Sequence, residues 1–181
     1  MRVRMPGGVR FTAVAAGTSF TVALDQGGHA WVWGNNESGE LGLGTSGTRS
    51  TPVQLALPAG TAFTAISADG DHTVALDRNG QAWTWGSTTV DNPGASIVVI
   101  PFPTYITMPV GVVFSTVAAG IDHSLALDQS GRAWAWGTDS NHQLGDGKST
   151  YAPNAVAVVM PSGVRFHVLA AAICCSYALS D

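Results

Sequence analysis

The chain has 181 residues, of which 45% are hydrophobic and 11% are charged, so it can bury a substantial core and is not a disordered segment. Twelve acidic and eight basic residues give a formal net charge of −4 without a basic cluster, so we expect no nucleic-acid partner. No apolar run reaches the roughly 18 residues of a membrane span and no export signal is visible, so we expect no membrane partner and the cytoplasm is the default location.

One string returns along the chain. "FTAVAAGTSFTVALDQGGHAWVWG" at Phe11 is followed by "FTAISADGDHTVALDRNGQAWTWG" and "FSTVAAGIDHSLALDQSGRAWAWG", and then by a shorter copy, "FHVLAAAICCSYALSD". The copies begin at Phe11, Phe63, Phe114 and Phe166, at intervals of 52, 51 and 52 residues. A fixed period of this size predicts a repeat architecture.

Each full copy predicts four short strands. The first strand begins at Phe11 and is rich in small residues. The second places Phe20, Val22 and Leu24 at a spacing of two, and a glycine-containing turn leads to "HAWVWG". After a loop rich in Gly, Ser and Thr, "TPVQLAL" forms the fourth strand, where Pro52 at its start suits an edge.

The third strand carries apolar residues on both faces, with Trp31 and Trp33 on one side and Val32 on the other. A sheet covered on both faces packs against a neighbour each way, and radial stacking of such sheets gives a β-propeller. We therefore predict an all-β fold, a β-propeller of four-stranded antiparallel blades. Residues 1–181 form one domain or propeller fragment of about three and a half repeats, at 11–62, 63–113, 114–165 and, in part, 166–181.

The ends of the chain carry incomplete repeats. "MRVRMPGGVRF" aligns with "VAVVMPSGVRF" before the fourth copy, so residues 1–5 are predicted to form a lone outer strand. The fourth copy stops where its third strand would begin. We expect either a fragment of a longer propeller or a unit that completes itself by association.

Cys174 and Cys175 are adjacent in the fourth copy. On a strand their side chains would point to opposite faces, which makes a shared metal or an ordinary disulfide awkward. We expect two small buried thiols in the fourth copy of a packed strand.

These strings resemble the repeat of the regulator of chromosome condensation family, with its "AAGxxHSLAL" strand pair, its "GxxWxWG" strand and an "NxxGQLGxG" loop that ends at proline. The resemblance implies blades of a propeller that usually closes with seven. It also implies one of three roles: GTPase exchange factor, inhibitor of β-lactamases, or interaction domain of a larger protein. The family histidine is present as His72 and His123, whereas Phe20 and Cys175 replace it in the other copies.

Other motifs are better explained by the repeat than by chemistry. "GLGTSG" at Gly42 and "GDGKST" at Gly145 lie in the repeat's loop without the helix that a phosphate site needs. "DSNHQLGDG" has Leu144 where a calcium loop needs glycine. The repeated positions Trp33, Trp85, Trp136, His72 and His123 are predicted to be structural. We expect no catalytic residues, no metal and no cofactor.

The second copy departs from the repeat after Trp85. "ASIVVIPFPTYI" is either an altered fourth strand buried in its blade or an apolar contact patch for a protein partner. The candidate partner-binding residues are Ile97, Val98, Val99, Ile100, Phe102 and Tyr105. The function we favour is a non-catalytic propeller module that binds another protein through its inter-strand loops. A structural protein that assembles with copies of itself is the alternative, and the family's regulatory roles are a further one.

Overall fold

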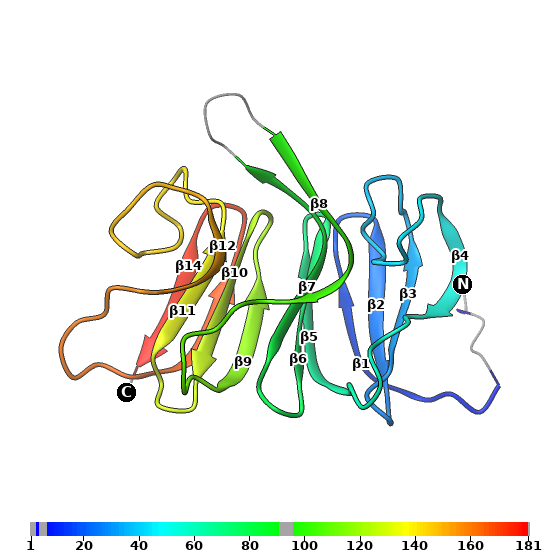
Figure 1. Cartoon of the computed structure of the whole chain (residues 1–181), viewed down its shortest axis with the longest axis horizontal. Coiled ribbons are helices and arrows are strands. Elements are labelled where there is room, and N and C mark those ends of the chain that lie inside the picture. Colours follow the sequence, from blue (N-terminus) through cyan, green and yellow to red (C-terminus); the bar gives the residue numbers. More distant parts are fainter. Residues whose placement is uncertain (1–2, 4–6, 91–95, 181) are drawn as a thin grey trace.

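The computed structural model describes residues 3, 7–90 and 96–180, and it consists of four separate antiparallel sheets (Figure 1). Three sheets have four strands, in the chain orders β1-β2-β3-β4, β5-β6-β7-β8 and β9-β10-β11-β12, and are called blades 1, 2 and 3. The fourth sheet pairs only β13 with β14 and is called the half-blade. The predicted all-β fold and its repeat of four strands are thereby confirmed. The predicted outer strand at residues 1–5 lies, apart from Val3, outside the described residues.

The strands follow the repeat closely. Their bounds are β1 Phe11–Ala16, β2 Phe20–Asp25, β3 Ala30–Gly34, β4 Arg49–Gln54, β5 Phe63–Asp69, β6 His72–Asp77, β7 Ala82–Val90, β8 Ser96–Tyr105, β9 Phe114–Ala119, β10 His123–Asp128, β11 Ala133–Gly137, β12 Ala152–Ala157, β13 Phe166–Ala171 and β14 Ser176–Ser180.

The tight turn between the second and third strands of each blade uses a glycine with positive φ. Gly28, Gly80 and Gly131 have φ angles of 82°, 74° and 78°. Backbone at these angles is strained for any residue with a Cβ, so glycine is the residue that the turn requires. The glycine-containing turn that the sequence predicts between the second and third strands is therefore present in all three blades.

The outer strand of each blade is irregular at one point. In blade 1, Val32 pairs with Val53 and Gly34 pairs with Arg49, so three residues of β4 lie opposite Trp33 alone. Pro52 lies in this irregular stretch rather than at the start of the strand, and its missing N–H needs no partner there. Blades 2 and 3 repeat the shift opposite Trp85 and Trp136.

The core lies between neighbouring blades. One apolar cluster joins residues of blades 1 and 2, among them Phe20, Leu41 and Trp85, and a second joins blades 2 and 3. In each blade the second tryptophan of the third strand stacks on the phenylalanine that starts the repeat, with ring centroids 5.9 to 6.2 Å apart. Trp85 and Trp136 are buried, but Trp33 is only half-buried.

The expectation for the two cysteines is wrong. Cys174 and Cys175 lie in the bend between β13 and β14 instead of within a strand, so the alternation of side chains does not apply to them. Cys174 is exposed and Cys175 is half-buried, so they are not a pair of buried thiols.

Candidate protein-interaction site

The hairpin of β7 and β8 is longer than its counterparts. In blades 1 and 3 the third strand ends at Gly34 and Gly137, whereas β7 continues past the equivalent Gly86 to Val90. The extension pairs Ser87 to Val90 with Val99 to Ser96. Figure 1 shows this hairpin projecting beyond the edge of the sheets that carries the β1–β2, β5–β6 and β9–β10 turns, here called the upper rim.

The structure divides the six candidate partner-binding residues between two faces of β8. Ile97, Val99, Phe102 and Tyr105 are 67%, 47%, 58% and 63% exposed and are called the hairpin patch. Val98 and Ile100 are half-buried on the opposite face, because side chains alternate along a strand. The segment therefore forms an altered fourth strand, but one whose outer apolar side chains face solvent.

The hairpin patch leans toward blade 1. The N–H of Gly44 donates a 2.8 Å hydrogen bond to the carbonyl of Pro101, and the ring of Phe102 lies directly on Gly44. The φ of 69° at Gly44 favours glycine, and a Cβ there would also push the ring of Phe102 aside. Between this loop and Val99 lies an open cleft of about 240 Å³, which Glu37 also lines.

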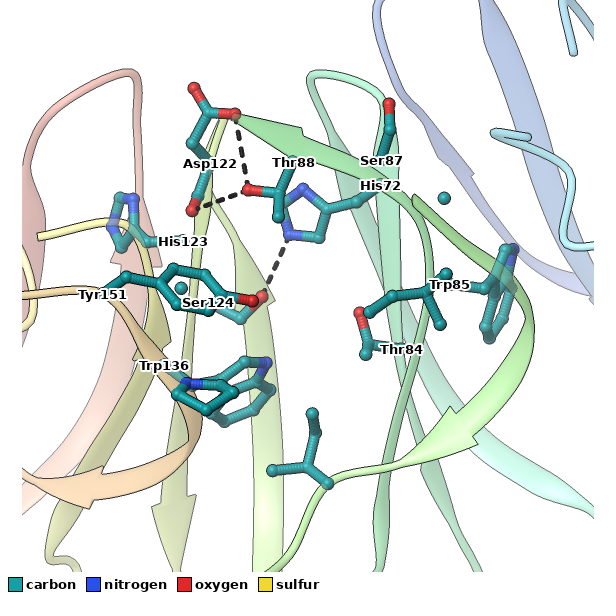
Figure 2. Close-up of a pocket in the computed structure, with 15 residues that line it drawn as sticks. His72, Thr84, Trp85, Ser87, Thr88, Asp122, His123, Ser124, Trp136 and Tyr151 are labelled. Atoms are coloured by element: carbon teal, nitrogen blue, oxygen red, sulfur yellow. Dashed lines mark hydrogen bonds between the residues drawn. The ribbon is translucent and has the colours of Figure 1, made fainter. Parts of the chain in front are cut away.

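The opposite face of the hairpin is joined to blade 3. Thr88 donates from Oγ1 to the backbone carbonyl of Asp122 at 3.1 Å, and its Oγ1 lies 3.4 Å from the Asp122 carboxylate (Figure 2). Ile100 lines a cavity of about 30 Å³ between blades 2 and 3, together with Trp136 and Tyr151. That volume holds one or two water molecules and is far below the 300 Å³ or more of a typical ligand pocket.

The loop beneath the hairpin patch, residues 35–48, is held by buried polar side chains. Asn36 accepts from the Leu41 N–H at 3.0 Å and donates to the Thr45 carbonyl. Glu40 is 1% exposed, and its carboxylate accepts from Asn35 Nδ2 at 2.8 Å and from the Ser38 N–H at 2.9 Å. Because these groups are satisfied internally, the loop is a rigid support for the hairpin.

The upper rim beside the hairpin is acidic. Burial raises the pKa of Asp71 above its usual value, and the nearby charges of Glu40 and Asp122 raise it further. The N–H of Ser87, in the first residue of the hairpin extension, donates to the Asp71 carbonyl at 2.9 Å. Carboxylates of blades 1, 2 and 3 therefore lie near one another at the base of the hairpin.

The predicted structural histidines lie at blade interfaces. His72 Nδ1 is 3.1 Å from the Ile121 carbonyl, which can only accept, so Nδ1 carries the proton and Nε2 accepts from the Ser124 hydroxyl at 3.0 Å. Burial lowers the pKa of His72, which keeps the ring neutral.

His123 uses the other tautomer. The Ser176 hydroxyl donates to the Gln143 carbonyl at 2.7 Å, so Ser176 Oγ must accept from His123 Nε2–H at 3.0 Å. Burial, followed by the nearby His72, lowers the pKa of His123 to about 4. Its Nδ1 is buried and has no hydrogen-bond partner within the described chain.

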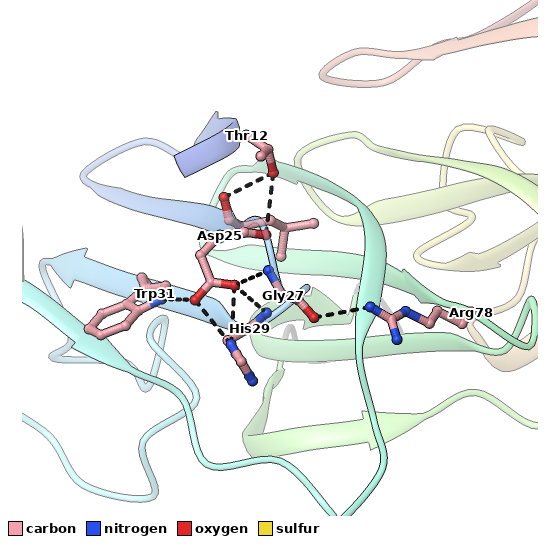
Figure 3. Close-up of polar contacts among 7 residues, drawn as sticks. Thr12, Asp25, Gly27, His29, Trp31 and Arg78 are labelled. Atoms are coloured by element: carbon pink, nitrogen blue, oxygen red, sulfur yellow. Dashed lines mark hydrogen bonds and ion pairs between the residues drawn. The ribbon is translucent and has the colours of Figure 1, made fainter. Parts of the chain in front are cut away.

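Sequence reasoning missed a repeated aspartate. Asp25 Oδ2 accepts from the indole N–H of Trp31 at 3.0 Å, and Oδ1 accepts from the N–H groups of Gly27 and His29 in the tight turn (Figure 3). Burial raises the pKa of Asp25, but these hydrogen bonds outweigh it and lower the pKa to about 2. The same tryptophan contact, also 3.0 Å, joins Asp77 to Trp83 and Asp128 to Trp134. The signal was an aspartate six residues before the first tryptophan of every full copy.

The remaining motifs lie on loops of the upper rim. Gly42–Gly47 belongs to the loop that supports the hairpin patch, and Gly145–Thr150 belongs to the corresponding loop of blade 3. Among the residues that the structure describes, no three His, Cys, Asp or Glu side chains are grouped to hold a metal ion. No helix in this same part of the chain could cross a membrane.

Comparisons with known proteins agree with the repeat. Residues 27–76 match the Regulator of chromosome condensation (RCC1) repeat, and a second description of that repeat matches residues 11–40 and 114–143. The Arabidopsis thaliana Ultraviolet-B receptor UVR8 is 31% identical over 164 residues, which cover 87% of this chain and 36% of the receptor. Human E3 ubiquitin-protein ligase HERC2 is 32% identical over 146 residues, 79% of this chain and 3% of the ligase.

Solved structures show the same fold. Human WBSCR16 superposes with a TM-score of 0.80 at 22% identity, over 97% of this chain and 46% of that protein. Prp20p from Saccharomyces cerevisiae gives a TM-score of 0.76 at 23% identity, over 97% of this chain and 44% of Prp20p. Its structure is described with its binding properties to Gsp1p and histones. The chain thus spans less than half of each of these proteins. It belongs to the family of regulator of chromosome condensation (RCC1) repeat proteins.

Proposed function

We propose that this chain is a non-catalytic module that binds a protein partner through the β7–β8 hairpin and the adjoining 35–48 loop. The observation that carries the proposal is the hairpin patch, where Ile97, Val99 and Phe102 are exposed on a strand that projects beyond the rim. Exposed apolar surface next to a rigid polar loop is typical of interfaces with other proteins.

The form of the site favours recognition over catalysis. The cavity between blades 2 and 3 is too small for a substrate, whereas the cleft beside Val99 is open and lined in part by glycines and serines of the loop. A partner could place an apolar side chain against the hairpin patch while its basic residues face the acidic upper rim. The relative Prp20p is described as binding Gsp1p and histones, which supports a regulatory or interaction role here.

Affinity capture with matched variants tests this proposal. In one variant Ile97→Asp and Phe102→Asp place charge on the hairpin patch. In the control, Val110→Asp places charge on a fully exposed residue of the β8–β9 connection, outside the patch. We expect the hairpin variant to lose specific partners that the wild-type chain and the control both retain. Identical sets of captured proteins for all three chains would contradict the proposal.

A second candidate function is self-association through the half-blade. One face of this sheet exposes Val168, Tyr177 and Leu179, at 44%, 59% and 59%, and β14 is paired only with β13 within the described chain. Apolar side chains gathered on an exposed sheet face are typical of a surface that packs against another chain. Light scattering coupled to size exclusion should then report dimers or larger species for the wild-type chain and monomers for Leu179→Asp. Monomers for both would remove this candidate.

A further inference from the structure

The bend between β13 and β14 brings two thiols together. Cys174 Sγ and Cys175 Sγ are 3.4 Å apart, and each thiol can act as the hydrogen-bond donor to the other. The bend is closed by a hydrogen bond of 2.9 Å from the Ala172 N–H to the Cys175 carbonyl. In the fourth copy Cys175 stands at the position that His72 and His123 occupy in blades 2 and 3. The histidine contacts described above therefore do not involve the thiols.

The thiol pair is accessible from solvent. Cys174 is exposed, Cys175 is half-buried, and both line a cleft of about 500 Å³ together with Leu144 and Tyr177. The hydrogen bond between the two thiols is the largest cause that raises the pKa of Cys174, so Cys174 is held in the thiol form at neutral pH. Because both thiols line this cleft, a reagent of moderate size can reach both sulfur atoms at once.

The geometry disfavours an internal disulfide. Neighbouring Cα atoms are about 3.8 Å apart across a trans peptide, whereas disulfides usually join Cα atoms about 4.4 to 6.8 Å apart. The sulfur atoms would also have to approach from 3.4 Å to the bonded distance of about 2.05 Å. A bridging atom between the sulfurs removes both requirements.

The sulfur separation selects among bridging atoms. With metal–sulfur bonds of about 2.3 Å, a linear two-coordinate ion would need sulfurs about 4.6 Å apart. At 3.4 Å, two such bonds meet at an angle of about 95°, which suits a pyramidal trivalent centre. A structural zinc site needs four protein ligands, and no third His, Cys, Asp or Glu is grouped with the thiols in the part of the chain that is described.

We propose that Cys174 and Cys175 form a chelating dithiol site for a trivalent organic arsenical. Such a compound brings its own carbon substituent and leaves two positions for sulfur. In the reaction, two S–H bonds and the arsenic–oxygen bond break, and two sulfur–arsenic bonds form. Both thiol protons leave with the oxygen as one water molecule, so nothing is oxidised or reduced.

Binding of phenylarsine oxide to the intact chain tests this site. Native mass spectrometry should show one adduct that has lost one water molecule, and titration should show binding at least about 100-fold tighter than to Cys174→Ser or Cys175→Ser. The second thiol acts within the same molecule, at an effective concentration in the millimolar range, and this accounts for the difference. A small dithiol should remove the adduct at concentrations at which a monothiol does not.

Two results would overturn the proposal. One is an adduct of equal affinity on the intact chain and on both single variants, which would mean that each thiol reacts alone. The other is no adduct on the intact chain. Far-ultraviolet circular dichroism of the variants, unchanged from the wild-type chain, ensures that a loss of binding reflects the missing thiol and not a missing fold.

Discussion

His72 Nε2 and Ser124 Oγ lie 3.0 Å apart across the interface between blades 2 and 3. The equivalent contact between blade 3 and the half-blade joins His123 Nε2 to Ser176 Oγ, also at 3.0 Å. Between blades 1 and 2 the contact is missing, because Phe20 occupies the histidine position. The partner on blade 2, Thr73, is fully buried and its hydroxyl has no hydrogen-bond partner among the described residues.

This difference predicts opposite effects for two similar substitutions. Thr73→Val removes a buried hydroxyl that no group satisfies, so the free energy of unfolding should rise by about 1 kcal/mol. Ser124→Ala leaves His72 Nε2 without its donor and should lower that free energy by about 1 to 3 kcal/mol. Urea denaturation measures both values, and a loss of stability in Thr73→Val would show that its hydroxyl has a partner.

Acid should weaken the blade interfaces before it protonates the carboxylates. The pKa of His123 is about 4 in the fold and 6.5 in its ordinary state, so the unfolded chain binds the proton more tightly between these values. The His123 contribution to stability is therefore complete above pH 6.5 and is lost as the pH falls toward 4, by up to about 3 kcal/mol.

Thermal melts between pH 7 and pH 4 check this dependence, with His123→Gln as the control. The melting temperature should fall less steeply with decreasing pH in the His123→Gln variant, because one of the titrating groups is gone. Asp25, whose pKa is lowered to about 2, acts in a separate window, below its ordinary value of 3.8. An unchanged slope in His123→Gln would show that other groups cause the acid loss.

The loops of blades 1 and 3 differ by one atom at a buried position. Asn36 donates to the Thr45 carbonyl, but the corresponding Asp139 cannot donate when ionised, and its Oδ2 is buried without a partner in the described structure. Asp139→Asn should stabilise the chain by about 1 to 2 kcal/mol, because the amide can donate as it does in blade 1. The reverse change, Asn36→Asp, should destabilise it by a similar amount in the same urea experiment.

The tryptophans that stack on the repeat phenylalanines should differ in how much they contribute to the free energy of unfolding. Trp85 is 0% exposed, so Trp85→Ala leaves a cavity and should cost about 3 to 5 kcal/mol. Trp33 is half-buried, and Trp33→Ala should cost clearly less, since solvent can fill part of the space. Equal losses in the two variants would contradict the observed difference in burial.

Periodicity allowed the strands, their turns and the blade order to be predicted, because each copy repeats the same alternation and the same glycine. It could not place side chains that depend on an exception to the repeat. The length of β7 and the outward face of β8 depend on a segment that left the pattern, and the approach of Cys174 to Cys175 depends on a bend. The repeated Asp25, Asp77 and Asp128 were visible in the sequence, but a carboxylate in a turn looked like an ordinary surface residue.

The most direct test of the proposed interaction site is site-specific photo-crosslinking from the hairpin patch. A photoreactive phenylalanine analogue replaces Phe102 in one chain and exposed Val110 in the other, and both chains are irradiated in the same cell extract. We expect one dominant crosslinked protein from position 102 that is absent from position 110. Crosslinks of the same identity and yield from both positions, or crosslinks from position 110 alone, would contradict it.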